Sequence, residues 1–140
     1  MGNRVQNLRH AIQNIAHLGG VTLLGCSKFR NTAPIGPTQP DYLNAVARIG
    51  TSLSPMELLI ALKGLEKAHQ RERTVRWGPR TLDLDILLFG NRILQHPKLV
   101  IPHPEMHRRS FVLEPMCDLA PGVRHPVLDR TVSELLQALS

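Results

Sequence analysis

Two aspartates, Asp83 and Asp85, are the residues whose type and spacing point most directly to chemistry in this 140-residue chain. They lie two apart in a segment expected to form a strand, residues 81–89, so their carboxylates project from one face about 7 Å apart. Such neighbours repel each other unless a cation lies between them, and Mg²⁺ prefers oxygen ligands of this kind. The alternative is a solvated strand face that happens to carry two acids, the commoner meaning of D-x-D alone.

The loop before this predicted strand is strongly basic. Arg71, Arg73, Arg76 and Arg80 fall within ten residues that contain one acid, Glu72. An arginine guanidinium stays charged and binds phosphate oxygens two at a time. A basic surface loop or a nucleic-acid contact would explain the arginines alone. Beside an acidic pair, they favour Mg²⁺-dependent chemistry on a polyphosphate.

The single tryptophan and the histidines leave alternatives open. Trp77 suits a core anchor as well as a cover over a base or ring at the site. His103 and His107 have the i, i+4 spacing of helical zinc ligands, and His96 is nearby. The prolines on either side of His103 argue against a shared helix, so a structural or phosphate-contacting role is preferred to zinc.

The composition is that of a globular protein with a basic balance. Hydrophobic residues make up 42% and charged residues 20%, and the net charge is +6. This charge favours an anionic partner such as nucleic acid, an acidic membrane or a phosphorylated small molecule. Two cysteines, Cys26 and Cys117, are too few for a disulfide scaffold and indicate the reducing cytosol, and no apolar run is long enough to cross a bilayer. The length fits one domain over residues 1–140.

The elements that must position these residues follow the order α-β-β-α-β. Apolar periodicity predicts a first helix before Gly19, strands over residues 21–29 and 42–49, a second helix from residue 55, and the 81–89 strand. This order fits an α+β fold with the ferredoxin-like β-α-β-β-α-β pattern, lacking its first strand and carrying C-terminal additions. Because that strand is central in the pattern, we expect a chain truncated at its N-terminus and unstable or weakly active as written.

Helix-start signals mark two of the helices. Ser54 and Glu57 form a capping box around Pro55, and Thr131 with Glu134 form another before a short C-terminal helix. A short strand is expected over residues 99–101, whereas residues 108–113 fit more than one structure. The predicted buried stripe of the second helix consists of Met56, Leu59, Leu62 and Leu65.

Three stretches together resemble the signatures of 6-hydroxymethyl-7,8-dihydropterin pyrophosphokinase. They are Tyr42-Leu43-Asn44-Ala45, the run R-W-G-P-R-T-L-D-L-D-I over residues 76–86, and Pro102-His103. The long run is highly specific, and the resemblance covers nearly the whole chain. It implies transfer of diphosphate from ATP to the hydroxymethyl group of the pterin, which gives AMP and the pterin diphosphate in folate biosynthesis.

The resemblance also implies roles for individual residues. Asp83 and Asp85 match two magnesium ligands, with two Mg²⁺ ions expected. The positions matched to ATP are Glu66, Arg71, Arg76, Trp77, Arg80, His103 and Arg109. Among the loop residues, those matched to catalysis are Arg71, Arg73, Trp77 and Arg80. The positions matched to the pterin are Thr32, Ile35, Tyr42, Asn44 and Phe111, of which the two aromatic rings would sandwich the heterocycle and the asparagine would pair with its edge.

The expected protein is therefore a cytosolic, ATP- and Mg²⁺-dependent diphosphotransferase. It would act as a monomer on small molecules, without a nucleic-acid or membrane partner. Two alternatives remain: a small RNA-binding module, which the basic pI near 10.2 would suit, and a catalytically inactive homologue that acts through contacts. An ATP-to-AMP assay with the hydroxymethyl pterin separates the three.

Overall fold

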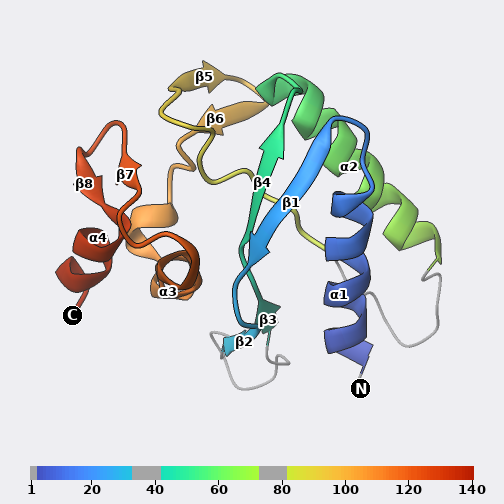
Figure 1. Cartoon of the computed structure of the whole chain (residues 1–140), viewed down its shortest axis with the longest axis horizontal. Helices are drawn as coiled ribbons and strands as arrows, with labels where there is room; N and C mark the ends of the chain where they lie inside the picture. Colours follow the sequence, from blue (N-terminus) through green and yellow to red (C-terminus); the bar gives the residue numbers. More distant parts are fainter. Residues whose placement is uncertain (1–2, 33–41, 73–81) are drawn as a thin grey trace.

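The computed structural model describes residues 3–32, 42–72 and 82–140, which form four α-helices and four two-stranded antiparallel sheets (Figure 1). The N-terminal elements are α1 (Asn3–Ala16), β1 (Val21–Cys26), β2 (Arg30–Thr32), β3 (Tyr42–Asn44), β4 (Ala47–Thr51) and α2 (Pro55–Glu72). The C-terminal elements are β5 (Leu94–His96), β6 (Leu99–Ile101), the 3-10 helix η1 (Met106–Arg108), α3 (Ser110–Leu119), β7 (Arg124–His125), β8 (Arg130–Thr131) and α4 (Val132–Ala138). The mixed class of helices and strands is confirmed.

The antiparallel pair β1–β4 lies beside the helices α1 and α2. Leu23 stands opposite Ile49, and the register shifts between Leu23 and Gly25, where a bulge increases the local twist. The helix α1 contacts both β1 and α2, and Figure 1 shows the two helices together on one side of the strand pair. The predicted first helix is confirmed, and the first strand is confirmed with its end at Cys26 rather than at residue 29.

The first hydrophobic core joins these strands to α2. Its buried members are Ile15, Val21, Leu58, Leu62, Ile86, Leu99 and Ile101. The capping box predicted for α2 is confirmed, since Ser54 N–H donates to Glu57 Oε1 (2.8 Å) and Glu57 N–H donates to Ser54 Oγ (3.2 Å). The predicted stripe packs on this core, with Leu62 buried and the other three residues partly buried against it. Leu58, which is 4% exposed, also belongs to the stripe but lies outside the predicted positions.

The single strand predicted over residues 42–49 is wrong, because the structure has β3 and β4 with a break at residues 45–46. Ser27 binds the backbone at this break. Its N–H donates to Val46 O (2.8 Å), and its Oγ accepts from Val46 N–H (2.9 Å). With both backbone groups of Val46 bound in this way, β2 and β3 form a separate small sheet beyond the lower end of β1 and β4 (Figure 1).

The strand predicted over residues 81–89 is also wrong over the part that the structure describes, since residues 82–89 pair with no strand. Residue 81 lies outside the described ranges. The predicted alternation is nevertheless present, because Asp83 and Asp85 are exposed while Ile86 is buried in the first core. This segment passes behind β1 and β4 in the view of Figure 1. Instead of a sheet ladder, contacts with α2 and with the loop before η1 hold this segment in position.

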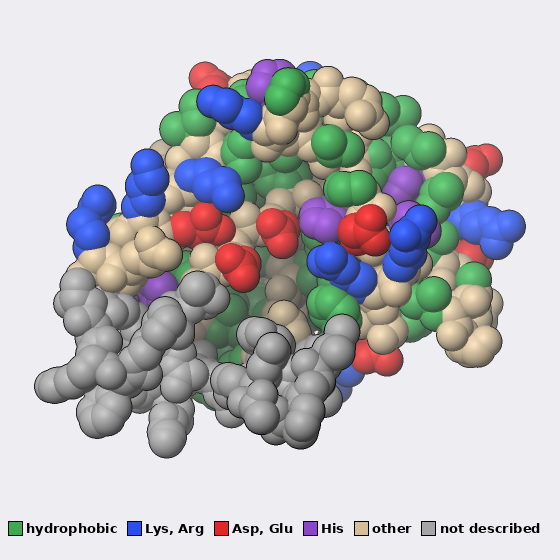
Figure 2. Space-filling model, turned by 180° about the vertical axis from the view of Figure 1, so that it is seen from behind, with side chains coloured by type: hydrophobic (Ala, Val, Ile, Leu, Met, Phe, Trp, Pro, Cys, Tyr) green, Lys and Arg blue, Asp and Glu red, His purple; other side chains and the backbone are tan. Residues whose placement is uncertain are grey.

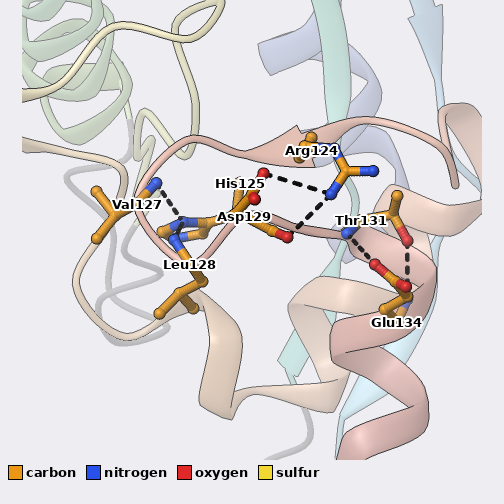
Figure 3. A network of polar contacts seen from close by, with 7 residues as sticks. All are labelled: Arg124, His125, Val127, Leu128, Asp129, Thr131 and Glu134. Atoms are coloured by element: carbon orange, nitrogen blue, oxygen red, sulfur yellow. Dashed lines mark hydrogen bonds and ion pairs between the residues drawn. The ribbon is translucent and has the colours of Figure 1, made fainter.

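The C-terminal elements pack around a second hydrophobic core. Its buried members are Met106, Leu113, Met116, Val132 and Leu135. The short strand at residues 99–101 is confirmed as β6, which pairs with β5, and residues 108–113 contain the end of η1 and the start of α3. The capping box of α4 is confirmed by two hydrogen bonds between Thr131 and Glu134, of 3.1 and 2.8 Å (Figure 3). Within the three described ranges, no helix is long and apolar enough to span a membrane.

Candidate active site

The two aspartates singled out by the sequence lie on the exposed side of the 82–89 segment. Asp83 and Asp85 are exposed, Leu84 between them is half-buried, and Ile86 is 8% exposed. Such alternation is typical of an extended chain, in which residues two apart share a side. Figure 2 views the molecule from behind relative to Figure 1, and acidic side chains gather near the middle of that face with lysine and arginine side chains on both sides. The carboxylates on this face therefore lie between cationic side chains (Figure 2).

A third carboxylate reaches the same segment from α2. Glu66 Oε2 accepts a 2.6 Å hydrogen bond from the backbone N–H of Leu84, the residue between the two aspartates. Its Oε1 lies 3.5 Å from Lys63 Nζ, and the Glu66 side chain is 18% exposed. A charged acceptor makes this hydrogen bond stronger than a neutral one. Glu66 therefore holds the peptide between the two aspartates, a contact that no spacing in the sequence signals.

The loop before η1 holds the 82–89 segment at its other end. His103 N–H donates to Leu87 O (2.9 Å), two residues beyond Asp85, and His103 Nδ1 accepts from Glu105 N–H (3.1 Å). The backbone of His103, a residue expected near the nucleotide, is thus bound to the segment that carries the aspartates. Its ring is held to the following turn.

His103 and His107 do not share a helix. His107 lies in η1 and His103 precedes it, and the His107 ring packs edge-on against His125 with centroids 6.4 Å apart. Among the residues in the described ranges, no three of the His, Cys, Asp and Glu side chains form a group that could hold a metal ion. A Mg²⁺ site needs fewer protein ligands, because one or two carboxylates suffice when water and phosphate supply the rest.

The start of α3 presents an aromatic ring and a cation together. Phe111, the second residue of this helix, is 36% exposed. The guanidinium carbon of Arg109 lies 5.7 Å from the centroid of the Phe111 ring, within the range of a cation–π contact. A residue expected at the pterin and one expected at ATP are therefore neighbours here.

The β2–β3 pair brings together other residues expected at the pterin. Thr32 stands opposite Tyr42, and Asn44 stands opposite Arg30. Asn44 is half-buried at the end of β3. For Thr32 and Tyr42 the structure describes the backbone alone. The helix α3 contacts β2, and β2 pairs with β3, so β2 connects the elements that carry Phe111 and Asn44.

The remaining site residues named from the sequence lie outside the described ranges. They are Ile35, Arg73, Arg76, Trp77 and Arg80. Arg71 lies within the described part of the chain, exposed in the last turn of α2. The structure thus places the site residues named from the sequence in two groups: the carboxylates and His103, at the 82–89 segment, and Asn44 and Phe111, on the two elements that flank β2.

Comparison with known proteins gives one consistent result. Residues 1–121 match the family of 7,8-dihydro-6-hydroxymethylpterin-pyrophosphokinase. A 2-amino-4-hydroxy-6-hydroxymethyldihydropteridine pyrophosphokinase of Haemophilus influenzae is 49% identical over 117 residues, which cover 83% of this chain and 73% of the relative. Proteins with the same name from Synechocystis and from Pseudomonas aeruginosa are 40% and 44% identical. These two alignments cover 98% and 95% of this chain, and 70% and 82% of the relatives.

Proposed function

The chain belongs to the 7,8-dihydro-6-hydroxymethylpterin-pyrophosphokinase family, and from this membership we infer that it transfers diphosphate from ATP to 6-hydroxymethyl-7,8-dihydropterin. The acceptor is the hydroxymethyl group, and the products are AMP and the pterin diphosphate used in folate biosynthesis. The family match over residues 1–121 carries this conclusion. The exposed aspartate pair at positions 83 and 85, which lies inside that match, agrees with it.

Asp83 and Asp85 would hold Mg²⁺, with two ions expected. Their hard oxygen donors suit this ion, and their exposed side of the segment leaves room for water and phosphate ligands. When bound, the ions would neutralise charge on the ATP phosphates. Glu66 would support the site through the backbone, because its carboxylate accepts a hydrogen bond from the N–H of Leu84, the residue between the two aspartates.

The phosphates of ATP require cations as well as metal. Arg71, Arg73, Arg76 and Arg80 would supply them, since each guanidinium can donate two parallel hydrogen bonds to phosphate oxygens. Trp77 would close over the same site. On the other side of the aspartates, His103 and Arg109 would contact the nucleotide, an assignment supported by the hydrogen bond from His103 N–H to Leu87 O.

The pterin would bind between the β2–β3 pair and α3. Phe111 and Tyr42 would stack on the two faces of the flat heterocycle, and the amide of Asn44 would satisfy its polar edge. Thr32 and Ile35 would offer backbone groups. The 36% exposure of Phe111, the pairing of β3 with β2 and the contact of β2 with α3 support this assignment.

The mechanism is mainly one of positioning and charge neutralisation. The pterin hydroxymethyl oxygen attacks the β-phosphorus of ATP in line, the bond from this phosphorus to the α–β bridging oxygen breaks, and AMP leaves. The guanidinium groups of the arginines stabilise the charge that develops on the transferred group. No side chain in the described ranges is assigned as the base that receives the hydroxyl proton.

We also propose that residues 1–140 form one monomeric domain with the ferredoxin-like arrangement of helices and strands. The pairing of β1 with β4 and the packing of α1 and α2 on the same core support this arrangement. The free thiols of Cys26 and Cys117 suit the reducing cytosol that we propose as its location.

An assay of AMP formation tests the proposed function directly. The full chain, Mg²⁺, ATP and 6-hydroxymethyl-7,8-dihydropterin should yield AMP and the pterin diphosphate in equal amounts, with no AMP when the pterin is omitted. A chain that binds both substrates without turnover would be an inactive homologue. Salt-sensitive RNA binding with no affinity for the pterin would instead identify a nucleic-acid module.

A further inference from the structure

An ion pair joins two elements on which the proposed pterin residues lie. Arg30 of β2 and Asp118 of α3 are 88 positions apart, and Arg30 Nη2 donates to both carboxylate oxygens of Asp118, at 2.8 and 2.9 Å. The two side chains are 35% and 24% exposed. The Lys63–Glu66 and Arg124–Asp129 pairs are longer, at 3.5 and 3.4 Å, and each has a partner at least half exposed. The Arg30–Asp118 contact is therefore the better formed.

Other contacts hold the last turn of α3 on the same stretch of backbone. A Cβ built on Gly25 would lie 3.3 Å from Leu119 Cδ2, so helix and strand are in close contact there. The pKa of Asp118 is lowered, first by the hydrogen bond from Arg30 and also by a hydrogen bond from the backbone of Lys28. The C-terminal end of α3 is thus joined to residues 25–30 by packing and by charge.

The strand register relates Arg30 to the proposed pterin site. Arg30 is the direct partner of Asn44 in the β2–β3 ladder. Side chains of directly opposite residues project from the same face of a strand pair. The guanidinium that binds Asp118 and the amide proposed to bind the pterin edge therefore lie side by side on one face.

The helix geometry relates Asp118 to the same site. Phe111 and Asp118 are seven residues apart in α3, which is nearly two full helical turns, so they share one face of the helix about 10 Å apart along its axis. The opposite face carries the buried Leu113 and Met116 of the second core. The face of α3 that binds Arg30 is the face that presents Phe111.

We propose that Arg30 and Asp118 are positioning residues for the pterin: their ion pair sets the separation of β2 from α3 and, through the β2–β3 ladder, the separation of Asn44 from Phe111. This inference rests on the proposed function, since it assigns the pterin to these two residues. Neither charged residue touches the substrate. Each acts through the element that it holds.

Calorimetric titration of the full chain tests this role. The probe is 6-hydroxymethylpterin, added with saturating Mg²⁺ and α,β-methylene-ATP. Asp118→Asn and Arg30→Gln should each weaken pterin binding about tenfold, within the range measured for coupled residues. The affinity for α,β-methylene-ATP should fall less than the affinity for the pterin, because most of the proposed nucleotide contacts, unlike Arg109, lie outside α3. The double variant should bind the pterin no more weakly than the weaker-binding of the two single variants.

Two further variants separate positioning from folding. Asp118→Glu keeps the charge and should recover most of the pterin affinity. Asp129→Asn is the matched control, because it removes the exposed Arg124–Asp129 pair of the β7–β8 turn and should leave both affinities unchanged.

The inference is overturned if wild type binds the pterin and Asp118→Asn binds it equally well. It is also overturned if the variants lose pterin and nucleotide affinity in parallel with a fall in thermal stability, since the pair would then be structural only. A wild-type chain that binds no pterin would overturn the proposed function, and this inference with it.

Discussion

At the scale of single residues, the aspartate pair carries the most direct prediction. Asp83→Asn and Asp85→Asn should each lower the rate of AMP formation by more than about 100-fold, because a lost metal ligand removes several kcal/mol of charge stabilisation. Both side chains are exposed, so the free energy of unfolding should change by less than about 0.5 kcal/mol. Steady-state kinetics at saturating Mg²⁺, with urea unfolding of the same samples, measures both quantities.

Asp129→Asn is the control for these substitutions, because it makes the same chemical change on the β7–β8 turn, and its rate should equal that of wild type. Either aspartate variant retaining more than about a tenth of the wild-type rate would contradict the metal assignment.

Glu66 should act on the proposed metal site through the backbone. Glu66→Ala leaves the half-buried Leu84 N–H without its charged acceptor, which should cost about 1–3 kcal/mol of unfolding free energy. The loosened segment should also raise the Mg²⁺ concentration that gives half-maximal rate. Glu66→Gln keeps an acceptor oxygen and should show a smaller change in both.

Lys63→Ala is the matched control for Glu66. It removes only the 3.5 Å ion pair with Glu66, in which Lys63 is 60% exposed, and should change stability by less than about 0.5 kcal/mol. If Glu66→Ala had no greater effect than Lys63→Ala on stability and on Mg²⁺ dependence, the contact with Leu84 would have no role at the site.

At the scale of elements, the β7–β8 turn is organised by a buried histidine. His125 is 5% exposed, and its Nδ1 accepts from the backbone N–H groups of Val127 and Leu128, at 3.2 and 3.1 Å (Figure 3). A protonated ring carries a hydrogen on Nδ1 and cannot accept these bonds. Burial lowers the pKa of His125 below its ordinary value of 6.5, and the nearby His107 lowers it further. The neutral ring is therefore the form that stabilises the turn.

This turn should make stability depend on pH. Because the folded-state pKa of His125 is lowered, its contribution is fully present above pH 6.5 and is lost as the pH falls from there through the folded-state pKa. His125→Asn supplies an acceptor that does not titrate, so the free energy of unfolding should fall less between pH 7 and about 5. Urea unfolding at stepped pH values measures the difference.

His96→Asn is the matched control for this pH effect. His96 Nδ1 also accepts a backbone N–H two residues on, from Lys98 at 3.0 Å, but the side chain is exposed. Because water can replace this exposed acceptor, His96→Asn should change the pH profile less than His125→Asn does. A profile that His125→Asn and His96→Asn alter equally would show that burial of His125 is not the cause.

At the scale of the whole molecule, the 82–89 segment joins the two hydrophobic cores. Leu84 and Phe89 pack against the first core with the buried Ile86, whereas Leu87 and Leu88 pack against the second. The segment that carries the aspartates is therefore held from both sides. Loss of either core should loosen the proposed metal site as well as the local fold.

A cavity in the second core tests this connection. Leu113 is fully buried, and Leu113→Ala should lower the free energy of unfolding by about 2–5 kcal/mol. Hydrogen exchange should show the amides of α2, on the first core, losing protection together with those of α4 on the second. Leu139→Ala, at a residue 44% exposed, is the control and should change little. Unchanged protection in α2 would mean that the cores open independently.

Local signals in the sequence were sufficient for several features. The capping boxes of Ser54 with Glu57 and of Thr131 with Glu134 are formed as predicted, because both partners lie within three residues and need no other part of the chain. Alternation alone placed Asp83 and Asp85 on the exposed side of their segment. The long motif around them indicated the family, which the match over residues 1–121 bears out.

Contacts between distant segments were decided only by the tertiary structure. Ser27 divides the strand expected over residues 42–49 by binding Val46, and Glu66 binds Leu84 in a segment expected to form a strand. Arg30 meets Asp118 from 88 positions away. Apolar periodicity specifies which side of an element is buried, but not which neighbour satisfies its backbone. That neighbour is set by how the elements pack, because a hydrogen bond or ion pair forms only where folding brings donor and acceptor within about 3 Å of each other.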